Sequence, residues 1–134
     1  GSWAVFSDKR LKNNISDYKD GLNSILKIKP VKFHYNEILE CDTSIEYVGV
    51  IAQELQEIAP FMTKPVKIKG TDYLEVDNSA MTYMLINAVK ELHQMNAKLE
   101  NELQVQKENA EDQKKKIETL SNQVEELVKQ YKSK

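Results

Sequence analysis

This chain of 134 residues has a single cysteine, Cys41, and no apolar run long enough to cross a membrane. One cysteine cannot form a disulfide within the chain, so Cys41 is expected to be a free thiol in a loop or at a strand end. A membrane-spanning helix needs about 20 consecutive, mostly apolar residues. Since neither such a run nor a signal peptide is visible, the sequence predicts no membrane partner.

An excess of charge of one sign is also missing. The formal net charge is -2, and charged residues make up 30% of the chain against 40% hydrophobic residues. Up to Asp77 there are 10 basic and 12 acidic residues, and after it there are 9 of each. Neither part is a basic arm that would bind nucleic acid, so the composition indicates a soluble, folded chain without a nucleic-acid partner.

Metal and phosphate motifs are absent as well. The chain has two histidines, His34 and His93, and neither belongs to a Cys, His and Asp spacing that is typical of a metal site. No glycine-rich phosphate loop is present. We therefore expect no metal and no cofactor, and structural or solvated roles for both histidines.

The pattern up to Asp77 predicts a small mixed domain in which helices and strands alternate. Its expected elements are helices over 17–28 and 52–58, strands over 31–35 and 47–51, and a hairpin of 66–69 and 73–76 around Gly70-Thr71. Within the second strand, Gly49 indicates a close backbone approach. A head of this size buries only about 60% of its unfolded surface and is marginally stable alone. We expect it to need a partner.

The last third of the chain has a heptad repeat without a break. Its a positions are Val89, Asn96, Leu103, Ala110, Ile117, Val124 and Tyr131, and its d positions are Leu85, Leu92, Leu99, Gln106, Gln113, Leu120 and Leu127. A sustained period of 3.5 residues is typical of a left-handed coiled coil. A single amphipathic helix lying on the head is the alternative, but so small a head could not cover so long a stripe.

The flanking positions favour parallel helices, because Glu102 at g would face Lys107 at e of a neighbour. Val or Ile at a with Leu at d favours two strands, so these positions alone leave dimer and trimer open. Polar residues at Asn96, Gln106 and Gln113 weaken the coil. They either specify its register or allow it to open.

Two motifs in the head point to chemistry only when they are read together. The first is Ser7-Asp8-Lys9-Arg10-Leu11-Lys12, and the second is YVGVIAQEL over residues 47–55. Alone, Ser7 and Lys12 are typical of a capping serine followed by a solvated basic turn. With the helix that ends before Pro30 and the long helix that starts near Met84, their order closely resembles the intramolecular chaperone domain of phage endosialidases, peptidase family S74. The same domain ends phage tailspikes, fibres and neck appendages, and it also occurs in bacterial surface proteins and in the myelin regulatory factor.

The resemblance implies a domain that trimerises an upstream fibre or stalk, lets it fold, and then cuts itself off. Carried onto this chain, it makes Ser7 the nucleophile, Lys12 the general base and Phe6–Ser7 the scissile bond. A lysine must be neutral to accept a proton, and burial favours its neutral form. Because residues five apart do not share a helical face, the pair needs a turn within 7–12 or a lysine from a neighbouring chain.

We therefore expect an α+β fold with a lead-in at 1–6, a chaperone and autoprotease head at 7–77, and a helix over 78–134 that forms a parallel trimeric coiled coil. Gly1-Ser2 is typical of tag removal, which suggests a fragment of a longer protein. The expected partners are two further copies and the upstream part of its own chain, on a virion tail, a bacterial surface or a secreted protein. The alternatives are an uncleaved trimerisation domain and a coiled coil that recruits a different protein.

Overall fold

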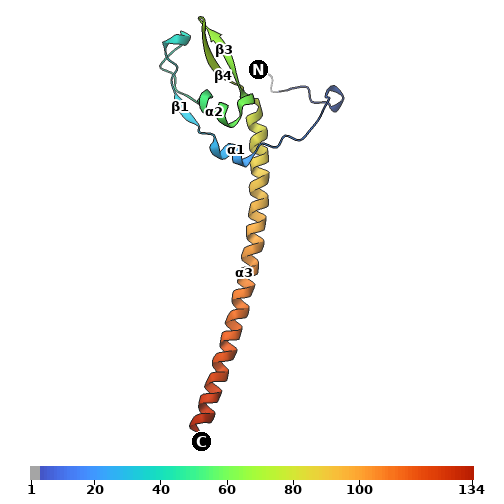
Figure 1. The fold of residues 1–134 in the computed structure, drawn as a ribbon, viewed down its shortest axis with the longest axis vertical. Helices are drawn as coiled ribbons and strands as arrows, with labels where there is room; N and C mark the ends of the chain where they lie inside the picture. The colour runs from blue at the N-terminus through green and yellow to red at the C-terminus, as the bar shows by residue number, and fades with distance from the viewer. Residues whose placement is uncertain (1–3) are drawn as a thin grey trace. The chain divides into compact units, whose positions relative to one another are not determined.

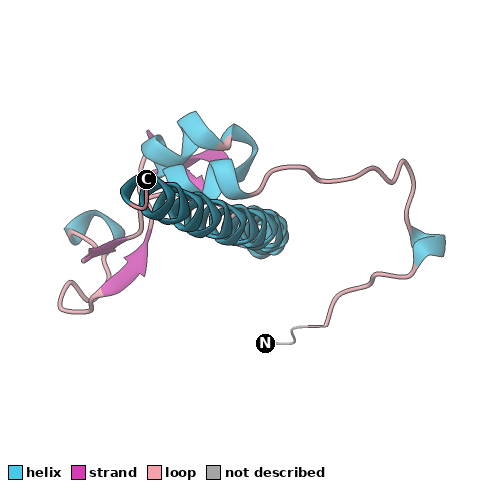
Figure 2. Cartoon of the chain, turned by 90° about the horizontal axis from the view of Figure 1, so that it is seen from below, coloured by secondary structure: helices cyan, strands magenta, loops and turns pink. Residues whose placement is uncertain are grey.

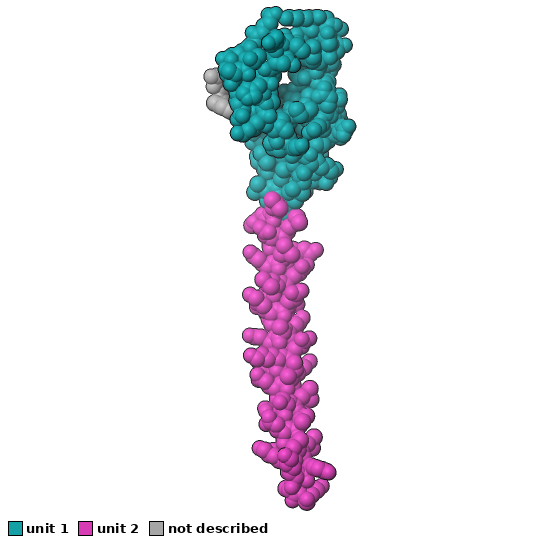
Figure 3. Space-filling model, turned by 90° about the vertical axis from the view of Figure 1, so that its left-hand side faces the viewer, with its two compact units in different colours: residues 1–91 teal, residues 92–134 magenta. Residues whose placement is uncertain are grey.

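The computed structural model describes residues 4–134, which divide into two compact units (Figures 1 and 3). The first unit ends at Glu91, and the second runs from Leu92 to Lys134. Three residues of the expected lead-in, 1–3, lie outside the described part of the chain. The elements in order are the 3-10 helix η1 (Lys9–Leu11), α1 (Leu22–Lys27), β1 (Val31–Phe33), η2 (Glu37–Leu39), β2 (Tyr47–Gly49), α2 (Ala52–Ile58), η3 (Pro60–Met62), β3 (Thr63–Ile68), β4 (Thr71–Val76), η4 (Asn78–Ala80) and α3 (Met81–Lys132).

Strands β1 and β2 pair antiparallel, with Val31 opposite Gly49 and Phe33 opposite Tyr47. Each strand ends two residues earlier than the sequence predicted. The rings of Phe33 and Tyr47 stack with centroids 5.8 Å apart. A Cβ on Gly49 would lie 3.1 Å from a ring carbon of Phe33, so the glycine makes room for this ring. The group that comes close to Gly49 is thus the side chain of Phe33, whereas the sequence predicted a close approach of backbone.

Strands β3 and β4 form the predicted hairpin, with Ile68 opposite Thr71. Its turn lies one residue earlier than expected, at Lys69-Gly70, and both of these residues have positive φ angles of 50° and 79°. Two positive φ angles match the twist that a two-residue hairpin turn requires. Glycine adopts such an angle without steric cost, which explains its place at the second position.

The core of the head is small and includes the start of α3. Its buried hydrophobic side chains are Leu55, Ala59, Met62, Met84 and Ala88. Helix α2 spans the residues that the sequence predicted, and its spacing places Leu55 and Ala59 on one face toward this core. Met84 is fully buried against the same cluster, so the first turns of α3 are part of the head's packing.

The prediction of a helix over residues 17–28 was wrong in its first part. Helix α1 begins at Leu22, and Gly21 precedes it in a non-helical conformation. The backbone carbonyl groups of Tyr18 and Asp20 accept hydrogen bonds from the side chain of Asn87 in α3. These carbonyls therefore bond to another element instead of to the next turn of α1.

The long C-terminal helix is confirmed, and so is the α+β class. Asp77 caps the short η4, since its Oδ1 accepts a hydrogen bond from the N–H of Ser79 at 2.9 Å. Helix α3 follows from Met81 to Lys132 over 52 residues. The division of the chain at Asp77 and the trimeric coiled coil stay predictions.

Candidate functional site

The segment from Ala4 to Lys19, which we call the arm, carries the first motif and is exposed along its whole length. Figure 2 shows it as loop interrupted by one short turn of helix, which is η1. Asp8 begins this turn, because its Oδ1 accepts a hydrogen bond from the N–H of Arg10 at 2.9 Å. The turn ends at Lys12, which is extended with φ of -121° and ψ of 141°.

The turn brings Ser7 and Lys12 together. Lys12 Nζ donates a hydrogen bond to Ser7 Oγ at 2.7 Å. One short 3-10 turn thus does what a regular α-helix could not do for residues five apart. The contact lies within one chain, which is the first of the two arrangements that the sequence left open.

The other charges of the motif are paired with each other. Arg10 Nε lies 3.0 Å from Asp8 Oδ1, and Arg10 Nη2 lies 2.8 Å from Asp8 Oδ2. This two-point pairing and the backbone bond from Arg10 lower the pKa of the Asp8 carboxyl below its usual value. The same pairing raises the pKa of Arg10. With Asp8 engaged by Arg10, Lys12 has Ser7 as its hydrogen-bond partner.

The site is open to solvent in the single chain. Ser7 and Lys12 are exposed, and the Phe6 side chain on the other side of the predicted scissile bond is 94% exposed. The hydrogen bond therefore holds Ser7 Oγ and Lys12 Nζ in contact while both residues stay exposed.

Residues 18–22, which we call the arm root, connect this site to the head. Asn87 Nδ2 donates to the carbonyl oxygens of Tyr18 at 2.8 Å and of Asp20 at 2.9 Å. Glu91 Oε2 accepts a hydrogen bond from the N–H of Leu22 at 2.6 Å. The sequence reasoning missed these contacts, since Asn87 and Glu91 look like ordinary polar helix positions beside the heptad seam.

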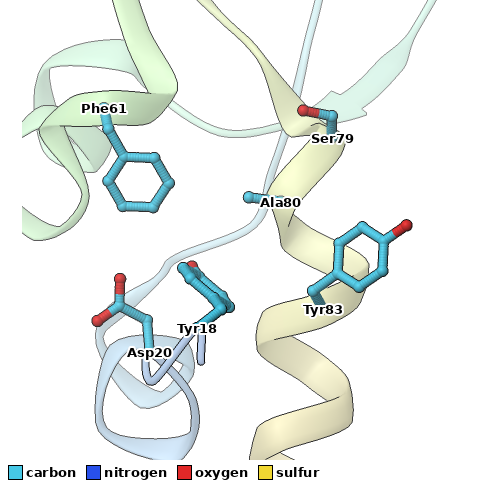
Figure 4. Close-up of a pocket in the computed structure, with 6 residues that line it drawn as sticks. All are labelled: Tyr18, Asp20, Phe61, Ser79, Ala80 and Tyr83. Carbon is cyan, nitrogen blue, oxygen red and sulfur yellow. The ribbon is translucent and has the colours of Figure 1, made fainter. Parts of the chain in front are cut away.

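A hollow of about 670 Å³ lies beside the arm root, lined by Tyr18, Asp20, Phe61, Ser79, Ala80 and Tyr83 (Figure 4). The rings of Tyr18 and Phe61 meet edge to face, with centroids 6.2 Å apart. Burial, and then the nearby Asp20 carboxylate, raise the pKa of Tyr18. Neither Ser7 nor Lys12 lines the hollow. The residues that line the hollow therefore take no part in the contact between Ser7 and Lys12.

Other candidate residues have ordinary surroundings. The Nδ1 atom of His34 lies 3.1 Å from the carbonyl oxygen of Thr43, and His93 is exposed on α3. Cys41 is an exposed free thiol in the loop before β2, as predicted. Within residues 4–134, no group of His, Cys, Asp and Glu side chains is arranged to hold a metal ion. No helix in that range has the length and apolarity to span a bilayer.

The apolar side chains at the predicted a and d positions are exposed in the single chain. Leu85 is 47% exposed and Leu127 is 63% exposed, which is unusual for leucines at regular spacing along a helix. The others with more than 40% exposure are Val89, Leu92, Leu99, Leu103, Ile117, Leu120, Val124 and Tyr131. Asn96 lies exposed in the same seam. The structure leaves this seam unpartnered.

Most of the head matches a known protein family. Residues 7–64 match the family described as chaperone of endosialidase, Peptidase_S74. The match begins at Ser7, and it includes Lys12 and all of the second motif. The resemblance identified from the sequence is therefore confirmed.

The chain is also similar to viral tail fibre proteins. It is 31% identical over 90 residues to the long tail fiber protein Gp37 of Enterobacteria phage M1, which covers 66% of this chain and 36% of that protein. The protein of the same name from phage Ox2 gives the same values. The one from phage K3 is 29% identical over 100 residues, covering 74% of this chain and 8% of that protein. The chain thus spans about a third of its M1 and Ox2 relatives.

Proposed function

We propose that this chain, whose residues 7–64 match the chaperone of endosialidase family, trimerises an upstream fibre and then releases itself by autoproteolysis at Phe6–Ser7. The observation that carries the cleavage is the 2.7 Å contact between Lys12 Nζ and Ser7 Oγ. The observation that supports the assembly is the exposed apolar seam of α3. Its relatives are named long tail fiber proteins, so the upstream part that it serves is a tail fibre on a virion.

Assembly is favoured because the head and the seam use different faces of α3. Met84 and Ala88 are buried on the face that packs on the head, whereas Leu85 and Val89 are exposed on the neighbouring face. Successive residues point about 100° apart around a helix, so Leu85 and Val89 stay exposed while Met84 and Ala88 pack on the head. Burying apolar side chains contributes roughly 25 cal/mol per Å², and a parallel coil of three α3 helices would bury the whole seam.

The reaction begins with the hydroxyl of Ser7. Lys12 in its neutral form takes the proton from Oγ, and Oγ attacks the carbonyl carbon of Phe6. A bond forms between Oγ and that carbon, and the Phe6–Ser7 peptide bond breaks, while the proton passes from Lys12 to the nitrogen of Ser7. The product is an ester between Phe6 and the Ser7 side chain. Water then opens this ester and gives a free Phe6 carboxylate.

Assembly and cutting are coupled through solvation. In the single chain Lys12 is exposed, and its Nζ donates a hydrogen bond to Ser7 Oγ. Packing of neighbouring chains or of the fibre around the arm removes water, which disfavours the charged form of a lysine. The proton of Ser7 Oγ then passes to Lys12 Nζ across the same short contact. Cutting would therefore follow assembly.

An uncleaved trimerisation domain is the second candidate, and the exposure of Phe6, Ser7 and Lys12 in the single chain favours it. A precursor extended upstream through the fibre separates the two. Autoproteolysis predicts two products, one of which begins at Ser7, and both should appear only after the trimer has formed. A precursor that trimerises and keeps its full mass would overturn the cleavage and leave the trimerisation role.

A further inference from the structure

The arm root approaches α3 more closely than an ordinary loop does. A Cβ on Gly21 would lie 2.5 Å from Glu91 Oε2, 2.9 Å from Asn87 Cβ and 3.3 Å from the backbone nitrogen of Ala88. Gly21 is buried, although every residue of the neighbouring arm is exposed. The backbone of the arm root is therefore seated directly on the helix, and a side chain at this position would push it away.

Two side chains of α3 hold the seated backbone by three hydrogen bonds. Asn87 binds the carbonyl groups of Tyr18 and Asp20, and Glu91 binds the N–H of Leu22. We call Asn87 and Glu91 the clamp. Gly21 offers α1 no side-chain cap, so Glu91 is the group that satisfies the first N–H of this helix.

The clamp depends on the helical state of α3. Asn87 and Glu91 are four residues apart, and only an α-helix places them one above the other on the same face. Leu85 and Val89, the first residues of the exposed seam, lie on the same two turns. Any process that makes the start of α3 more rigid therefore stabilises the clamp as well.

The helix alone is a weak support for the clamp. Helices in water owe most of their stability to the packing of an apolar face. The apolar side chains of α3 from Leu92 onward are exposed in the single chain. Helical ends without such packing open locally at little cost in free energy. Partners in the seam would provide the missing packing.

We propose that Asn87 and Glu91 are positioning residues for the self-cleavage proposed above, which transmit assembly of the seam to the arm that carries Ser7 and Lys12. The clamp is formed in the single chain, where the seam is empty. Filling the seam makes α3 more rigid, so the clamp opens less often and the arm leaves the head at a fixed point. The clamp determines the position of the arm root. The contact between Ser7 and Lys12 is formed within the arm itself.

The first test measures the clamp without any cleavage. Amide hydrogen exchange at Leu22 is followed in the Ser7→Ala chain, once with an intact seam and once with Leu103→Lys and Leu120→Lys. We expect exchange at Leu22 to be at least about tenfold faster when the seam is broken. The matched control carries Asn101→Lys and Asn122→Lys, which add the same charge to the same helix at the outward f positions. Equal protection of Leu22 in all three chains would overturn the proposal.

The second test measures the rate of self-cleavage in the extended precursor. Asn87→Ala should leave the trimer mass unchanged and slow cutting per trimer by about tenfold to a hundredfold, as a misplaced reacting group does. Asn101→Ala is the control, because it makes the same change on an exposed part of α3 outside the clamp. Cutting of the Asn87→Ala trimer at the normal rate would refute a positioning role.

The two tests separate this proposal from the proposed function on which it rests. If the unaltered precursor is never cut but Leu22 is protected only with an intact seam, autoproteolysis fails and the clamp stands as a link between assembly and the arm. If the precursor is cut and Leu22 is protected equally with and without a seam, the function stands and the clamp fails. Glu91→Ala provides a further readout. It should remove the protection of Leu22, while Glu91→Gln, which keeps an acceptor oxygen, should restore most of it.

Discussion

The ammonium group of Lys12 lies 2.7 Å from the hydroxyl oxygen of Ser7, across a single 3-10 turn that Asp8 caps. The two residues are five positions apart in the chain, a spacing that a regular helix would place on different faces. The local backbone therefore brings together two groups that could perform Ser/Lys chemistry, without help from a neighbouring chain.

The first prediction concerns these two residues. In the extended precursor, Ser7→Ala removes the proposed nucleophile, and Lys12→Ala removes the proposed base. Each should lower the rate of cutting by at least about a hundredfold. Lys12→Arg should fail as well, because a guanidinium group stays protonated. Gel analysis and mass spectrometry of the trimer measure the uncut fraction.

Lys9→Ala is the control for this series, since it removes a nearby positive charge but leaves the contact between Lys12 and Ser7. It should be cut normally. Full processing of the Lys12→Ala precursor would exclude Lys12 as the base and leave the chaperone role alone.

The second prediction concerns the turn. Asp8→Ala removes the cap of η1 and the partner of Arg10, so the arm should lose the geometry that joins Ser7 to Lys12. We expect about tenfold slower cutting. Asp8→Asn keeps an oxygen that can accept from the Arg10 N–H, and it should retain more activity. Equal rates for all three chains would show that the turn is not needed.

The titration of Asp8 offers an independent check. Its pKa is lowered by the hydrogen bond from Arg10, so the charged carboxylate is the form that the turn favours. The contribution to the turn is complete above the ordinary value of 3.8 and is lost as the pH falls through the lowered pKa. The amide proton of Arg10 should report this change by nuclear magnetic resonance. An amide shift that titrates above the ordinary value would contradict the pairing.

How far the sequence could predict this molecule depends on the range of each interaction. Helix α2, the hairpin around Gly70 and the long helix α3 follow local rules of spacing, turn chemistry and capping, and all three were predicted. The seating of Gly21 on α3 was not, since its partners Asn87 and Glu91 lie far along the chain. No local pattern distinguishes an asparagine that binds two distant carbonyl groups from one that faces water.

The motif from Ser7 to Lys12 was also only partly predictable from the sequence. The pairing of Ser7 with Lys12 was expected from a family resemblance, while the turn that produces it depends on the side chain of Asp8. The spacing of serine and lysine alone would have argued against contact. The sequence alone predicted no role for Arg10. Its pairing with Asp8 leaves Lys12 as the cation that contacts Ser7.

The third prediction is the assembly itself. Sedimentation of the intact chain at micromolar concentration should give the mass of three chains, with the helices parallel. Leu103→Lys and Leu120→Lys place charges in the seam and should shift the mass to one chain, since a buried unpaired charge is strongly unfavourable. Asn101→Lys and Asn122→Lys should not change it. A mass of two chains for the unaltered protein would refute the trimer and favour the dimer that the a and d residues also permit.

The last prediction separates the contributions of α3 to the head and to the coil. Truncation after Asp77 removes Met84 and Ala88 from the small core. Loss of a large buried side chain such as methionine lowers the free energy of unfolding by about 2–5 kcal/mol. That fragment should melt without a cooperative transition or aggregate. Truncation after Glu91 keeps the core and the clamp residues but removes most of the seam. This fragment should still unfold cooperatively, with a lower melting temperature than the full chain, because the rest of α3 no longer packs in a coiled coil. A fragment ending at Asp77 that melts as sharply as the full chain would show that the head does not depend on α3.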